Sequence, residues 1–189
     1  MAALAVLLDA NVLYPAPLRD VLLQLASDGL FKPYWSASIQ DEWISNLLLN
    51  RPDLSIERLK RTRSLMETAF PDSTVSAYEH LIDTMHLPDP DDRHVLAAAI
   101  AAKVDLIITK NLADFPDSIL KSHDLVAIHP DLLLHMLIQS SPDYVCASIK
   151  SCRIRLVNPP KTIDEYLGIL ENQDLKQTVA ALRKLSQLL

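Results

Sequence analysis

The segment that decides the fold is Leu87–Pro116, which reads LPDPDDRHVLAAAIAAKVDLIITKNLADFP. Its acidic turn leads into an alanine-rich stretch that predicts a helix over about 90–103, because proline and acids both suit the first turn of a helix. The apolar residues 105–109 then predict a buried strand, and a second acidic loop follows it. A helix and a buried strand in this order indicate an α/β fold with a central parallel sheet.

The start of the chain has the same character. The apolar run over residues 2–8 stops at Asp9, which is typical of a strand buried on both faces. Short strands are also predicted at about 31–35 and 125–129. We expect Asp9 to lie at the carboxyl edge of the sheet, where α/β proteins bind their ligands. A charge at the end of an apolar strand needs a partner, so Asp9 is the acid that is hardest to explain by structure alone.

Other acids have a structural explanation when each is considered by itself. Ser38 is the predicted N-cap of a second helix, and Glu42 in its first turns would complement the helix dipole. Asp89 is the predicted N-cap of the alanine-rich helix, and Asp91 and Asp92 suit its first turn. Only the joint arrangement of the acids therefore points to a site.

Composition and charge argue against several classes of protein function. The chain has 189 residues and a net charge of −6. A protein that grips nucleic acid by bulk charge is usually basic, so this acidity argues against a plain nucleic-acid binder and fits a local acidic cluster neutralised by metal. No glycine-rich phosphate loop, zinc-type histidine spacing or serine-nucleophile elbow is present, which argues against those three kinds of site.

The sequence also indicates a cytoplasmic protein. Its cysteines, Cys146 and Cys152, show no metal-ligand spacing, and so few cysteines in such a chain suggest a reducing compartment. The first residues lack the positive region of a signal peptide, and no apolar run approaches the roughly 20 residues that span a bilayer. We therefore expect no membrane association.

The pattern changes after Pro130, where only helices are predicted. We expect an α/β domain over residues 1–130 and a helical C-terminal extension over residues 131–189. The apolar stripes of the extension allow two interpretations, cover for the core or a dock for a partner. Within the first part, Arg58 and Arg61 share part of one helix face, which is either a solvated surface or a patch for RNA phosphates.

The acids become informative when the sheet is considered. In a parallel α/β sheet, the carboxyl ends of strands and the amino ends of helices meet at one edge. Four carboxylates can therefore gather there, namely Asp9, Glu42, Asp92 and Asp114. Carboxylates so close together repel one another, and a hard divalent cation such as Mg²⁺ or Mn²⁺ removes that conflict. A water with a lowered pKa on such an ion can attack a phosphodiester, so the pattern predicts a metal-dependent nuclease.

Four motifs in order resemble the PIN-domain ribonucleases. They are LLDANVL at 7–13, WSASIQDEW at 35–43, LPDPDDRHVLAAAI at 87–100 and IITKNLADFP at 107–116. Within that family the chain is similar to the toxin component of VapBC-type toxin–antitoxin pairs, and the helical tail is similar to that of the longer members.

The resemblance implies a PIN-like (Rossmann-like) three-layer fold with four or five parallel strands. It implies a Mg²⁺- or Mn²⁺-dependent endoribonuclease, often a homodimer, that acts on RNA and is inhibited by a cognate antitoxin. Carried over by position, Asp9, Glu42 and Asp92 match the first three acids of the family, and Asp114 is the candidate for the fourth. The implied metal ligands are Asp9, Asp92 and Asp114.

One departure from the family pattern leaves the fourth position open. Many members have an acid where this chain has Asn111, so Asp114 supplies the carboxylate or Asn111 holds a metal-bound water. Asp91 substitutes for Asp92 if the alignment is shifted by one. Asn11 is expected to fix the Asp9 loop, and Thr109 to position its loop or contact a phosphate.

Two other functions are considered. A PIN-like domain without catalysis could serve as an RNA- or protein-binding module, and intact acids are what separates the enzyme from that alternative. A flap-type DNA nuclease would need long insertions and a basic arch, which this sequence lacks.

Overall fold

The computed structural model describes residues 4–189, which form two compact units. The first comprises residues 4–14 and 31–128, and the second comprises residues 15–30 and 129–189. The beginning of the predicted first strand, residues 2 and 3, lies outside the described part of the chain. The predicted domains over 1–130 and 131–189 stay a prediction.

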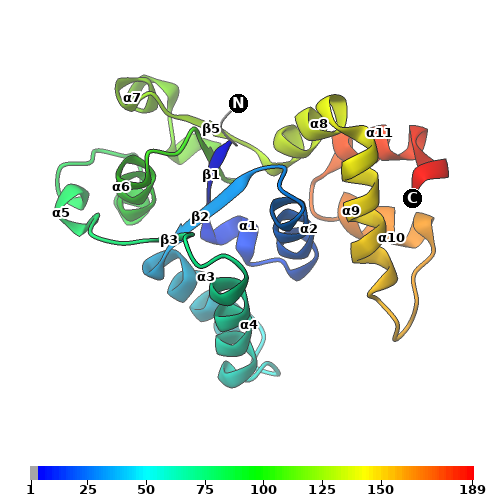
Figure 1. Ribbon diagram of the computed structural model, residues 1–189. Helices are drawn as coiled ribbons and strands as arrows, with labels where there is room; N and C mark the ends of the chain where they lie inside the picture. The colour runs from blue at the N-terminus through cyan, green and yellow to red at the C-terminus, as the bar shows by residue number, and fades with distance from the viewer. Residues whose placement is uncertain (1–3) are drawn as a thin grey trace. The chain divides into compact units, whose positions relative to one another are not determined.

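The first unit contains a sheet of five parallel strands in the order β3-β2-β1-β4-β5 (Figure 1). The strands are β1 Ala5–Leu8, β2 Lys32–Ser36, β3 Thr74–Val75, β4 Leu106–Ile108 and β5 Val126–Ile128. Leu7 at the centre is fully buried and pairs with Tyr34 on one side and Ile107 on the other. The apolar runs of β1 and β4 are therefore interior strands, which confirms the predicted α/β fold with a parallel sheet.

Helices cover the sheet on both faces. They are α1 Ala10–Leu13, α3 Ala37–Asn50, α4 Ile56–Ala69, α5 Glu79–Ile82, α6 Arg93–Ala102 and α7 Asp117–Leu120. Both α3 and α6 pack on β2, and Figure 1 shows them on its two sides. The alanines of α6 at positions 97, 98 and 99 are fully buried, so this helix can approach the strands closely.

The strand order reverses direction between β1 and β4. From β1 the chain moves outward to β2 and β3, and it then crosses back to form β4 and β5 on the other side. In parallel α/β sheets, ligands bind at the carboxyl ends of the strands that flank such a switch point. Asp9 directly follows β1 and Thr109 directly follows β4.

Three local predictions need correction. The N-cap of α3 is Ser36, whose hydroxyl accepts from Ile39 N, whereas the predicted cap Ser38 bonds to the Tyr78 hydroxyl. No helix was predicted directly after Asp9, where the short helix α1 forms. The short strand β3 was not predicted either, because two residues carry no alternating pattern.

The second unit is helical. Its elements are α2 Ala16–Ser27, α8 Pro130–Ser140, α9 Pro142–Ile154, α10 Ile163–Glu171, α11 Lys176–Lys184 and the 3₁₀ turn η4 Ser186–Leu188. The buried carboxylate of Asp131 accepts from the backbone N–H groups of Gln177 and Thr178, so α8 caps the amino end of α11. None of the helices within residues 4–189 is both long and apolar enough to span a membrane.

Candidate metal centre

Asp9 is held by hydrogen bonds at the end of β1. Its carboxylate is buried, Oδ1 accepts from Ala10 N at 2.6 Å, and it thereby caps α1. Oδ2 accepts from Asn11 Nδ2 at 2.6 Å and from Thr109 Oγ1 at 2.7 Å. Both oxygens are therefore fixed. These three hydrogen-bond donors stabilise the buried negative charge of Asp9.

Asn11 and Thr109 join the loops that follow β1 and β4. Asn11 donates to Thr109 Oγ1 at 2.8 Å and accepts from Lys110 N at 2.9 Å. Thr109 Oγ1 also accepts from Asn111 N at 3.0 Å. These hydrogen bonds connect the Asp9 loop to the loop after β4, and the supporting roles expected for Asn11 and Thr109 stay a prediction.

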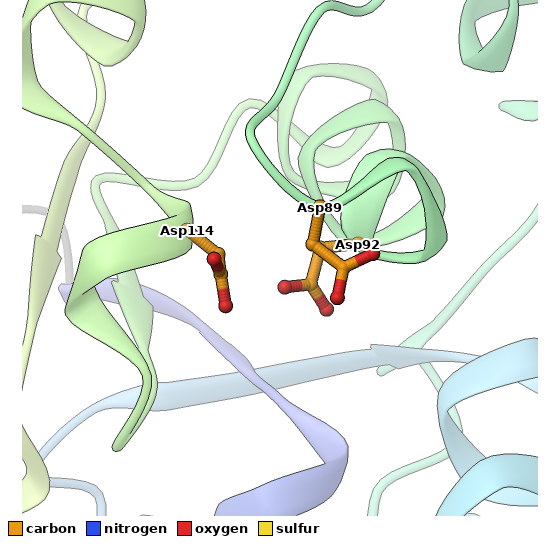
Figure 2. A group of neighbouring side chains, drawn as sticks. All are labelled: Asp89, Asp92 and Asp114. Atoms are coloured by element: carbon orange, nitrogen blue, oxygen red, sulfur yellow. The ribbon is translucent and has the colours of Figure 1, made fainter.

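A second group of acids lies close together in space. One carboxylate oxygen from each of Asp89, Asp92 and Asp114 lies within 4.8 Å of the others. Figure 2 shows Asp114 on one side, with Asp89 and Asp92 opposite, and their carboxylates extend into the space between. Asp89 Oδ1 caps the turn before α6 by accepting from Asp91 N, and Asn111 Nδ2 donates to Asp114 Oδ2.

Electrostatics place Asp92 at the centre of the acids. Partial burial raises its pKa to about 7, and the charges of Asp9, Asp114, Asp89 and Glu42 all act in the same direction. Burial also raises the pKa of Asp9 to about 6, against the hydrogen bond from Thr109, which lowers it. The four predicted acids are thus close enough for their charges to act on one another.

Glu42 lies beside this group, on the wall of a groove. The groove has a volume of about 560 Å³ and is lined by Ser38, Asp41, Glu42, Ser45, Asn46, Asp91, Asp92 and His94. Glu42 Oε2 lies 3.3 Å from His94 Nε2. Glu42 and Asp92 therefore connect the acidic group to an open space large enough for a nucleotide.

Two residues of this site escaped sequence reasoning. Asp89 had a sufficient explanation as an N-cap, and nothing in the sequence showed that its carboxylate also turns toward Asp92. His94 lies in no zinc-type spacing, so its contact with Glu42 could only be found in space. Of the remaining predicted residues, Asp91 is exposed on the groove wall, and Arg58 and Arg61 are exposed on α4.

The residues present fit a hard divalent cation. All the converging donors are carboxylate oxygens, which Mg²⁺ and Mn²⁺ prefer over nitrogen or sulfur. Burial and then the neighbouring acidic charges raise the pKa of Asp92 in the metal-free protein, and a cation would relieve the repulsive part of this effect.

These raised pKa values predict how stability depends on pH without metal. Since the folded protein holds protons on Asp9 and Asp92 that the unfolded chain has released, the free energy of unfolding should fall as pH rises through 6 and 7. For Asp9 alone we expect a fall of about 1.5 kcal/mol between pH 5 and pH 8. Urea unfolding in EDTA at several pH values measures this. Saturating Mn²⁺ should reverse the trend, and equal slopes with and without the ion would contradict the prediction.

The sequence matches known families over both of its parts. Residues 5–113 match the PIN domain, and residues 130–184 match the VapC50 C-terminal domain. The chain is 33% identical over 132 residues to the protein named "Putative ribonuclease VapC50" from Mycobacterium tuberculosis (strain ATCC 25618 / H37Rv). That alignment covers 68% of this chain and 77% of the relative. No solved structure matches the chain significantly.

Proposed function

Because this chain belongs to the PIN-domain family, we propose that it is a Mg²⁺- or Mn²⁺-dependent endoribonuclease, the toxin of a toxin–antitoxin pair. The observation that carries the proposal is the crowding of acids around Asp92 at the switch point of the sheet. The relative's name adds support, since it describes a ribonuclease.

Each acid has a proposed role in this reaction. Asp9, Asp92 and Asp114 would hold the ion, and the cap residue Asp89 adds a further carboxylate. A bound ion would lower the pKa of a water and neutralise charge that develops on the phosphate. Glu42, at the groove side of the group, would orient the attacking water and accept its proton.

The supporting residues set the geometry of these acids. Asn11 and Thr109 hold Asp9 by the hydrogen bonds described above. Asn111 donates to Asp114, so we propose that Asp114 supplies the fourth carboxylate and Asn111 directs it. Thr109, whose hydroxyl is already engaged, is assigned a positioning role.

The partners follow from the same assignment. RNA is the proposed substrate, and Arg58 and Arg61 on α4 are proposed to contact its phosphates. A cognate antitoxin would inhibit the enzyme, which we place in the cytoplasm, and a homodimer is the proposed assembly. We also propose that residues 1–130 act as the nuclease domain and that residues 131–189 form a helical C-terminal extension, which shares its compact unit with α2.

Metal removal tests the proposal directly. Labelled structured RNA should be cut in Mn²⁺ or Mg²⁺ and left intact in EDTA, and added Mn²⁺ should restore cutting after EDTA treatment. The cleavage is followed by gel electrophoresis, and Mn²⁺ binding by calorimetry. A protein that binds neither ion and cuts none of several RNAs would instead support the alternative, an inactive RNA- or protein-binding module.

Asparagine at position 89 tests whether Asp89 serves the metal as well as the helix cap. Asparagine keeps an oxygen that can cap Asp91 N, but it removes the charge, so we expect Asp89→Asn to weaken Mn²⁺ binding about 10-fold. Asp91→Asn is the matched control, because it removes an equal charge two positions away and outside the close group. Calorimetry should show a change of less than about 3-fold for this control. Equal losses would mean that only the overall charge matters, and a loss confined to Asp91→Asn would favour the shifted alignment.

A further inference from the structure

His94 lies beside Glu42 at the mouth of the groove. It belongs to the first turn of α6, and Glu42 belongs to α3, so the 3.3 Å contact joins two helices on opposite faces of the sheet. The His94 side chain is 18% exposed, whereas that of Glu42 is 40% exposed. A nearly buried imidazole thus supports a carboxylate that solvent and substrate can reach.

From this geometry we propose that His94 is a positioning residue, which holds the Glu42 carboxylate in place for the attacking water. The proposal rests on the proposed nuclease function. A glutamate that is 40% exposed can turn about three side-chain bonds, and a polar contact with the imidazole limits that freedom.

The two ring nitrogens of His94 have different surroundings. Nε2 lies 3.3 Å from Glu42 Oε2, an ionised carboxylate oxygen that can only accept. Nδ1 is buried and has no hydrogen-bond partner within residues 4–189. Of the two ring nitrogens, Nε2 is therefore the one whose contact with Glu42 can hold the carboxylate. Of the two carboxylate oxygens of Glu42, Oε2 contacts His94, and Oε1 would accept from the attacking water in this proposal.

The contact between His94 and Glu42 lies next to the acidic group because His94 is close to Asp92 in the sequence. Asp92 and His94 are two positions apart at the head of α6, and both line the groove with Glu42. Movement of Glu42 relative to His94 would therefore also be movement relative to the acidic group. A residue that only filled space at this point would need no polar atom toward Glu42.

Replacing His94 with asparagine or glutamine distinguishes a positioning role from a packing role. The amide nitrogen of glutamine reaches about as far as Nε2, whereas that of asparagine reaches only the place of Nδ1. We expect His94→Asn to lower kcat about 10- to 100-fold with KM little changed, and His94→Gln to restore most of the loss. Mn²⁺ affinity, measured by calorimetry, should stay within about 3-fold of wild type in both variants, because the metal-holding acids are intact.

A double-mutant cycle with Glu42→Ala completes the test. If His94 acts through Glu42, His94→Asn should cost nothing further in the Glu42→Ala background, measured by single-turnover cleavage. Multiplicative losses in the cycle, or equal activity of the asparagine variant and wild type, would overturn the positioning role while leaving the nuclease function in place. A wild type that binds Mn²⁺ but cuts no RNA would remove both proposals together.

Discussion

Replacing Asp92 with asparagine is expected to lower the rate of RNA cleavage about 1,000-fold and, at the same time, to stabilise the metal-free protein. The loss of activity follows from removing the carboxylate around which the other acids gather. The gain in stability follows from the raised pKa of Asp92, because burial disfavours its charge and the neighbouring acids Asp9, Asp114, Asp89 and Glu42 repel it. At pH 8 without metal, we expect a gain of about 1 kcal/mol after allowing for solvent screening.

The local structure makes this substitution a clean one. Asp92 occupies the N-cap position of α6, but its side chain makes no capping hydrogen bond, so asparagine sacrifices none. The gain should shrink as pH falls and vanish only below about pH 4, where Asp92 is protonated in the unfolded chain as well as in the folded protein. Urea unfolding in EDTA between pH 4 and pH 8 measures the stability, and gel assays measure cleavage. A variant that loses stability at pH 8, or that still cuts RNA at the wild-type rate, would refute the role of Asp92.

Those features of the fold that depend on long apolar runs could be predicted from the sequence. The runs before Asp9 and before Thr109 form β1 and β4, and their acidic loops meet because neighbouring parallel strands end at the same edge. The alanines after His94 predicted a helix that lies close to the sheet, and α6 has that position. Each of these features is set by many residues acting together, so a local error does not remove it.

The details that were missed depend on single contacts. The strand β3 has two residues and pairs only with β2, so no pattern marks it. Asp89 performs a local capping task that hides its second role, and His94 meets Glu42 from a distant part of the sequence. Such roles are set by side-chain directions after the fold has formed, and sequence spacing does not contain those directions.

Asp9 should behave differently from Asp92 when it is replaced, although cleavage should fall by a similar factor of about 1,000. Asp9→Ala removes the cap of α1 and the acceptor shared by Asn11 and Thr109, so buried donors lose a charged partner. We expect the free energy of unfolding to decrease by about 2 kcal/mol at pH 8, measured by urea unfolding in EDTA. The relief of burying a charge offsets part of this loss, since burial raises the pKa of Asp9.

Thr109→Val provides the control that separates the two effects of Asp9. Valine keeps the shape of a fully buried side chain but removes the hydroxyl that donates to Asp9 Oδ2. The same hydroxyl accepts from Asn11 Nδ2 and Asn111 N, so these two bonds are lost as well, and the Asp9 carboxylate itself remains. This variant should lose a comparable part of the stability, about 1–2 kcal/mol, and only about 10-fold in cleavage rate. If Thr109→Val were as inactive as Asp9→Ala, loss of the loop structure would explain the inactivity of both variants. That result would contradict a direct role for the Asp9 carboxylate. If Asp9→Ala alone is inactive at a similar stability, the carboxylate takes part in the chemistry, because the scaffold around it is equally weakened in the two proteins.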